Sequence, residues 1–114
     1  VIKKKSHKEL TMKVLRVMVH GQSLTKADDF GTIVSGSKGY LRCAFQFTDT
    51  QWDRVRKIAV FEDGEKEEAV VLDKSGQCDV PDTITNKTFF RVRLVGVDKE
   101  RKLMTERLLI NQRR

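Results

Sequence analysis

The feature that most constrains the fold is an alternation of apolar and polar side chains that recurs along most of the chain. It is clearest in residues 40–47, where every second position is apolar: Leu41, Cys43, Phe45 and Phe47. A period of two places successive side chains on opposite faces of a β-strand. We therefore expect strands that bury one face and expose the other.

Turn signals divide this alternation into short segments, such as the Asp-Gly pair at residues 63–64, which is typical of a tight hairpin. Residues 27–39 read as a long loop rich in Gly, Ser and Asp. Residues 103–110 also fit one face of a helix, but the turn before them and the six preceding strands favour a strand. The predicted strands are residues 12–19, 40–47, 55–61, 69–72, 77–80, 88–97 and 103–110. Seven short strands predict an all-β protein, an antiparallel β-sandwich.

Length and charge indicate one domain with basic ends. The 114 residues suit a single domain, which we assign to residues 12–112. Of the formal net charge of +7, four positive charges are lysines in residues 1–8 and two are arginines in residues 113–114. The domain itself is therefore close to neutral. We interpret residues 1–11 as a basic N-terminal tail or a translated leader before a start at Met12, and residues 113–114 as a basic C-terminal end.

Few residues offer chemistry. Ser23 or Ser37 could be combined with His20 and Asp28, but no nucleophile-elbow sequence supports a catalytic triad. The adjacent acids at residues 28–29 and 67–68 are expected to point apart into water. We therefore expect no enzyme and no cofactor.

Metal and membrane binding are not expected either. Cys43, Cys78, His7 and His20 lack the close spacing that seeds a metal site. Cys78 could approach Cys43, although two buried thiols are the simpler expectation for a protein assembled in the cytosol. No apolar run approaches the ~18 residues of a membrane-spanning helix.

A basic chain also raises nucleic-acid binding as an alternative function. Two aromatic side chains, Tyr40 and Phe89, could stack on bases if they shared an exposed sheet face with nearby arginines. Alternatively, the arginines pair with acidic residues across strands. The candidate nucleic-acid contacts are Lys3, Lys4, Lys5, Arg42, Arg91 and Arg93.

The remaining function class is recognition of another protein. Sandwich domains of this size act through loops and sheet edges. The long connection between residues 21 and 39 is the predicted adaptable contact surface. The candidate partner contacts on it are Asp28, Asp29, Phe30, Ser37 and Lys38.

A series of motifs resembles small immunoglobulin-like (Ig-like) modules in structural proteins of phages and prophages of Gram-positive bacteria. The similarity covers roughly residues 14–110, and its most distinctive part is the Cys-x-Val-Pro stretch at residues 78–81. The sequence departs just afterwards, because Asp82 and Thr83 stand where such modules often carry an aromatic and an acidic residue. The motifs are residues 45–47, Trp52 and residues 59–61, 71–73, 78–81, 90–92, 95–96 and 103–105.

The resemblance implies an Ig-like β-sandwich that serves as a non-enzymatic virion component of a tail, baseplate, fibre or head-associated part. Such a module would be assembled in the bacterial cytoplasm and held in multiple copies by contacts with other virion proteins or by self-assembly. It implies no catalytic residues. It places five side chains in the core: Trp52, Phe61, Leu72, Val80 and Phe90.

Overall fold

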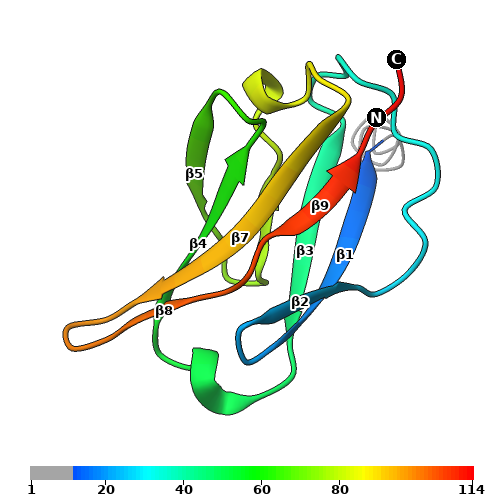
Figure 1. Ribbon diagram of the computed structural model, residues 1–114. Coiled ribbons are helices and arrows are strands. Elements are labelled where there is room, and N and C mark those ends of the chain that lie inside the picture. Colours follow the sequence, from blue (N-terminus) through cyan, green and yellow to red (C-terminus); the bar gives the residue numbers. More distant parts are fainter. Residues whose placement is uncertain (1–11) are drawn as a thin grey trace, which may run out of the picture.

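The computed structural model describes residues 12–114, which form two β-sheets that pack on each other (Figure 1). The predicted basic tail of residues 1–11, with the candidate nucleic-acid contacts Lys3, Lys4 and Lys5, lies outside the described residues. Within the described part, no helix is long and apolar enough to cross a membrane. The expected all-β class is confirmed.

One sheet has four strands in the order β2-β1-β3-β6. Its strands are β1 (Lys13–His20), β2 (Ser23–Lys26), β3 (Leu41–Phe47) and β6 (Gln77–Asp79). Three of them confirm the strands predicted at residues 12–19, 40–47 and 77–80. β2 was not predicted, because it is four residues long and buries only Leu24.

β1 and β3 are parallel, with Lys13 opposite Leu41 and Val19 opposite Phe47. Parallel neighbours need a connection that returns to the end where the first strand began. β2 and residues 27–40 provide that return. The expectation of an entirely antiparallel sandwich is therefore wrong at this strand pair.

The other sheet has five strands in the order β5-β4-β7-β8, and β9 also pairs with β7. Its strands are β4 (Arg56–Glu62), β5 (Glu67–Val71), β7 (Phe89–Val97), β8 (Lys102–Met104) and β9 (Leu108–Asn111). Two 3-10 helices, η1 (Thr50–Trp52) and η2 (Asp82–Ile84), lie in connections between strands. Residues 12–114 therefore contain nine strands instead of the predicted seven, because β2 is additional and the last predicted strand is divided into β8 and β9.

Thr105 explains how β8 and β9 can both pair with β7 despite the break between them. The Leu94 N–H donates to Thr105 Oγ1 at 2.9 Å, and the Thr105 N–H donates to the Leu94 carbonyl at 3.0 Å. Both backbone groups of Leu94 are therefore satisfied at the interruption. The Thr105 side chain is buried, and its hydroxyl donates in turn to the Glu106 carbonyl at 2.8 Å.

The core between the sheets contains the five side chains that the resemblance placed there, which confirms that expectation. Trp52 and Phe61 are completely buried, and the other three are at most 8% exposed. Trp52 lies at the end of the sandwich, where its Nε1–H donates to the Gly21 carbonyl at 2.8 Å. Its ring packs so closely on β7 that a Cβ at Gly96 would lie 2.8 Å from Trp52 Cζ3.

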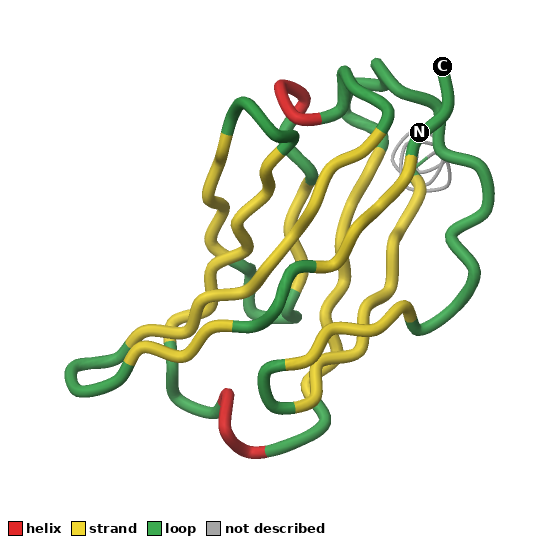
Figure 2. The backbone as a smooth tube through the Cα atoms, viewed as in Figure 1, coloured by secondary structure: helices red, strands yellow, loops and turns green. Residues whose placement is uncertain are grey.

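Residues 27–39, here called the strap, run along one side of the sandwich as a long loop (Figure 2). Two strap side chains are part of the core, since Phe30 is 5% and Ile33 is 3% exposed. The strap also pairs with the C-terminal end of the chain, because the Arg113 N–H donates to the Ile33 carbonyl at 2.7 Å and the Ser35 N–H donates to the Arg113 carbonyl at 2.6 Å. The sandwich therefore includes Arg113, one residue beyond the predicted boundary at 112.

Candidate functional site

Of the residues considered for catalysis, Ser23 lies opposite His20 in the register of β1 and β2, whereas Asp28 and Ser37 lie on the strap. The exposed His20 ring has Nδ1 3.1 Å from Thr48 Oγ1. Asp28 is paired with Arg16 at 3.6 Å, and Ser37 Oγ donates to a backbone carbonyl within the strap at 3.2 Å. In the described part of the chain, no hydrogen bond or ion pair joins His20 to Ser23, Ser37 or Asp28.

The two cysteines lie directly opposite each other on β3 and β6, as free buried thiols. Burial raises the pKa of the Cys78 thiol to about 12 and also raises that of Cys43, where the neighbouring Cys78 adds to the effect. Both thiols therefore stay protonated at neutral pH, which disfavours reactivity. Among residues 12–114, no three His, Cys, Asp or Glu side chains are grouped so that they could hold a metal ion.

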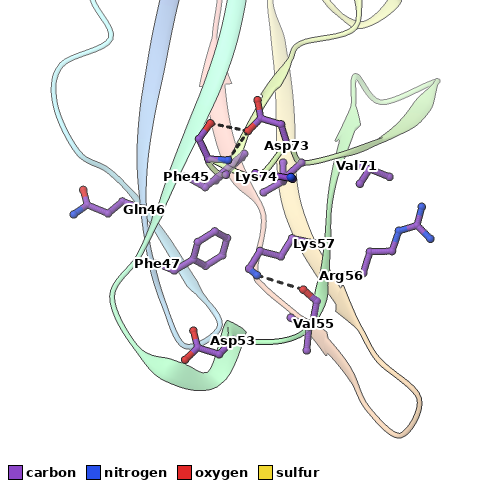
Figure 3. A pocket seen from close by; sticks show the side chains of 13 residues that line it. Phe45, Gln46, Phe47, Asp53, Val55, Arg56, Lys57, Val71, Asp73 and Lys74 are labelled. Atoms are coloured by element: carbon purple, nitrogen blue, oxygen red, sulfur yellow. Dashed lines mark hydrogen bonds between the residues drawn. The ribbon is translucent and has the colours of Figure 1, made fainter.

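A pocket of about 600 Å³ opens at one end of the sandwich, between β3, β4 and the turn after β5 (Figure 3). Two of its charged side chains, Lys57 and Asp73, contact other groups of the protein itself. Lys57 Nζ donates to the Val55 carbonyl at 3.3 Å and lies 5.3 Å from the centre of the Phe47 ring. Asp73 Oδ1 accepts hydrogen bonds from the turn that follows it, so neither charged group is available to bind a ligand.

The candidate nucleic-acid contacts outside the tail do not share a sheet. Arg42 lies on β3 in the four-stranded sheet, whereas Arg91 and Arg93 lie on β7 in the other sheet. Arg42 forms ion pairs with Asp73 and Asp79. Arg91 is paired with Glu62, and Arg93 is paired with Glu67. The structure therefore favours the alternative in which the arginines pair with acidic residues across strands.

The strap does not present its five candidate partner contacts as one surface. Phe30 is buried, so its ring packs in the core and is unavailable to a partner. Asp29 is exposed, but its Oδ1 accepts a hydrogen bond from the Gly31 N–H at 2.9 Å. Asp28 contacts β1, while Ser37 is held at the other end of the strap by the Thr85 hydroxyl, which donates to its carbonyl. Lys38 is exposed.

The outer face of the five-stranded sheet carries a continuous row of apolar side chains that crosses four strands. The register places Ile58 opposite both Val71 and Val95, and Val95 opposite Met104. None of the four belongs to the core cluster between the sheets. Val71 and Met104, at the two ends, are 49% and 36% exposed, whereas Ile58 is half-buried and Val95 is only 8% exposed. We call these four residues the apolar row.

Neighbouring side chains extend the apolar row along the sheet. Val60 and Ala69 are paired in the register next to it, and Val97 lies beyond Val95 on β7. Arg93 forms an ion pair with Glu67 at 3.4 Å although β4 lies between their strands, so its side chain crosses the sheet over β4. This position buries Arg93 Nε without a hydrogen-bond partner. An arginine held in this way lengthens the apolar surface with its methylene groups.

The outer face of the four-stranded sheet is polar by comparison. Arg42 spans it, donating to Asp79 and Asp73 at 2.7 Å each and to Gln77 at 2.9 Å. Exposed apolar side chains on a surface are ordinary when they are single, whereas a contiguous patch marks an interaction site. The two outer faces therefore differ in polarity, and the apolar row is the candidate contact site.

Our sequence interpretation missed the apolar row, although a signal for it was present. Residues 58–61 and 69–72 are uninterrupted apolar runs, in contrast to the alternation of residues 40–47. An uninterrupted apolar strand indicates that both of its faces are covered. In residues 12–114 the other sheet covers one face of β4. The Arg93 side chain covers part of the second face, where Val60 is 7% exposed, and Ile58 and Val71 on the same face remain open to a further surface.

The interactions of Asp73 with its own turn and with Arg42 make the stability of the protein depend on pH. Hydrogen bonds from the Gln77 N–H and from Ser75 lower the pKa of Asp73, and Arg42 lowers it further. A carboxyl with a lowered folded pKa stabilises the protein fully above its unfolded pKa of about 3.9, and this stabilisation is lost as the pH falls through the folded value. We expect Asp73→Asn to melt at a lower temperature than the unmodified protein at pH 7. The difference should shrink as the pH is lowered below about 4, and thermal unfolding followed by circular dichroism across this pH range checks this.

No protein-family model, curated protein or solved structure matches the chain. These comparisons therefore give no link to phage modules, and that resemblance stays an expectation from the sequence motifs. The structure itself shows a polar outer face on one sheet and an apolar outer face on the other, and this contrast is the basis for the proposed function.

Proposed function

We propose that the protein is a non-enzymatic module that acts through protein–protein contacts made by the outer face of its five-stranded sheet. The observation that carries the proposal is the apolar row, which crosses four strands on the outer face of the sheet and is exposed at its two ends, Val71 and Met104. Burying such a strip against another protein removes apolar surface from water, which drives association at roughly 25 cal/mol per Å².

The setting that we propose is a virion, in which the module is a structural or attachment part of a phage or prophage particle. The ground for this setting is the resemblance of the sequence motifs to Ig-like virion modules. The burial of Trp52, Phe61, Leu72, Val80 and Phe90 bears on the fold alone. An Ig-like sandwich in such a particle would be present in multiple copies, and contact through a sheet face suits repeated packing.

Particles purified from the source bacterium provide the test. We expect the protein to cosediment with them on a density gradient and to be lost when Val71→Glu places a charge in the apolar row. Val14→Glu is the matched control, because Val14 is a 38% exposed valine on the outer face of the other sheet. It should leave the particle content of the protein unchanged.

Two results would contradict the proposal. One is a protein that never occurs in particles. The other is retention of the Val71→Glu and Val14→Glu variants to the same extent. Binding to a DNA duplex that falls linearly with the logarithm of salt concentration would instead favour the nucleic-acid alternative.

A further inference from the structure

We propose that Cys43 and Cys78 are a site of disulfide formation within the folded chain, with a low-molecular-weight disulfide such as oxidised glutathione as the oxidant. This inference goes beyond the proposed function, because it concerns two side chains of the core and makes no use of the apolar row. Three observations support it: the strand register, the side of the sheet on which both thiols lie, and the position of β6 at a sheet edge.

The register sets the two cysteines directly opposite each other on antiparallel strands, Cys43 on β3 and Cys78 on β6. Two residues further along both strands, the Val80 N–H donates to the Leu41 carbonyl at 3.0 Å. Because hydrogen-bonded pairs recur at every second position of an antiparallel ladder, the two cysteines also form such a pair. The Cα atoms of such a pair lie about 5.5 Å apart, within the range of ~4.4–6.8 Å that disulfides span.

Both thiols lie on the side of the four-stranded sheet that faces the core. Cys43 is completely buried and Cys78 is 4% exposed, and both belong to the core cluster between the sheets as free thiols. The Cβ atoms of directly opposite residues lie about 4.5–5.5 Å apart, whereas a disulfide needs about 3.5–4.5 Å. A shift of about 1 Å by one of the two strands is therefore enough to let the sulfurs bond.

The strand that can make this shift is β6. It is three residues long and stands at the end of the sheet order β2-β1-β3-β6. On the outer face it is held by Arg42, which donates to Gln77 at 2.9 Å and to Asp79 at 2.7 Å. Segments with few buried contacts open locally at a lower free-energy cost than the whole fold. Opening of β6 therefore gives a dissolved oxidant access to Cys78, while Cys43 stays on the central strand β3.

The reaction with oxidised glutathione consists of two thiol–disulfide exchange steps. The Cys78 thiolate attacks one sulfur of glutathione disulfide, which releases one glutathione thiolate and leaves a mixed disulfide on Cys78. The Cys43 thiolate then attacks the Cys78 sulfur and releases the second glutathione thiolate. Two protein thiols are thereby oxidised to one disulfide, one glutathione disulfide is reduced to two thiols, and the two protons that the cysteines lose are taken up by the released thiolates.

The first exchange step should be slow and should depend on the opening of β6. Burial raises the pKa of both thiols, so the attacking thiolate is scarce while β6 is closed. Once formed, the bond closes the chain between residues 43 and 78 into a loop that contains β4 and β5 of the other sheet. A cross-link over such a distance in sequence restricts the unfolded chain. We therefore expect the oxidised protein to melt about 10 °C higher than the reduced protein.

Incubation of the folded protein with oxidised glutathione, followed by mass spectrometry, tests the site. We expect a single chain that is lighter by the mass of two hydrogen atoms, with the peptides of Cys43 and Cys78 joined. Its higher melting temperature should return to the starting value when dithiothreitol is added. Cys43→Ala should stop at the mixed disulfide on Cys78, and Cys78→Ala should react far more slowly, because its remaining thiol lies on the central strand.

Arg42→Ala tests the route through β6. The substitution removes the side-chain contacts that hold this strand on the outer face, so β6 should open more often and the disulfide should form about fivefold faster. Arg91→Ala is the matched control, because Arg91 pairs with Glu62 in the other sheet and its loss should leave the rate unchanged. Equal rates for Arg42→Ala and Arg91→Ala would contradict this route.

Four results would overturn the inference itself. They are two free thiols after prolonged incubation of the folded protein, a disulfide that forms only in urea, a bond that joins two chains, and a melting temperature that does not rise on oxidation. None of them bears on the proposed function, because the apolar row lies on the outer face of the other sheet and contains no cysteine.

Discussion

Replacing Trp52 with alanine is expected to lower the free energy of unfolding by about 3–5 kcal/mol, the cost of removing a large buried aromatic side chain. Trp52 is fully buried, and its ring centre lies 5.5 Å from that of Phe47. It contacts β7 at Gly96 and donates to the Gly21 carbonyl, so it links the turn after β1 to the five-stranded sheet. A domain of this size has a total stability of about 5–15 kcal/mol.

Urea unfolding followed by circular dichroism measures this loss, because Trp52 is the single tryptophan and its fluorescence disappears with the substitution. Trp52→Phe separates packing from hydrogen bonding. It keeps an aromatic ring but cannot donate to the Gly21 carbonyl, so we expect a smaller loss of about 1–3 kcal/mol. If Trp52→Ala and the unmodified protein had the same free energy of unfolding, packing of the Trp52 ring would not stabilise this end of the sandwich.

Replacing Gly76 with alanine is expected to cost about 2–4 kcal/mol for two separate reasons. The residue has a φ of +80°, a conformation in which an L side chain costs about 1–2 kcal/mol. A Cβ would also lie 2.9 Å from the Phe45 carbonyl oxygen. Because this oxygen belongs to the backbone, it can move away only if the backbone of β3 moves with it. Overpacking of this kind typically costs a further ~1–3 kcal/mol.

Gly36→Ala is the matched control, because Gly36 has a φ of +87° and a Cβ there would meet nothing within 4 Å. It should lose only the backbone part, about 1–2 kcal/mol. The difference between the two urea midpoints therefore isolates the steric contact with β3. Equal losses for the two variants would mean that the contact between Gly76 and β3 contributes nothing to stability.

Much of the fold could be predicted from the sequence because the signals are local. The alternation in residues 40–47 and 88–97 identifies β3 and β7, and the Asp-Gly pair identifies the β4–β5 hairpin. Features set by contacts distant in sequence were not predicted. The parallel pairing of β1 with β3 depends on where the strap returns the chain, and no residue pattern within either strand records that direction.

The strap shows why composition alone misleads. Its Gly, Ser and Asp residues correctly predicted a loop, and a loop on the surface suggested a contact site. Phe30 and Ile33, however, fill the core at the side of the sandwich, and the Arg113 backbone pairs with the strap. A loop that closes a core is held in place by packing, which the sequence around Phe30 does not reveal.

The candidate site could be predicted only in part. The pairing of Arg42, Arg91 and Arg93 with acidic neighbours was one of two alternatives, and strand register was needed to choose between them. The apolar row combines residues from four strands that are far apart in the chain. The apolar runs indicate that β4 and β5 have a second apolar face, but only the register aligns Val71 with Met104 across the sheet.

Oxidation of methionine side chains by dilute hydrogen peroxide tests the central claim most directly, because the chain carries a probe on each outer face. Met104 belongs to the apolar row, and Met18 lies on the outer face of the four-stranded sheet. We predict that Met104 is oxidised more slowly in protein held in particles than in the isolated protein, while the rate for Met18 is unchanged, as read from peptide masses. Equal rates for Met104 in the two states, or protection of Met18 instead, would contradict the account.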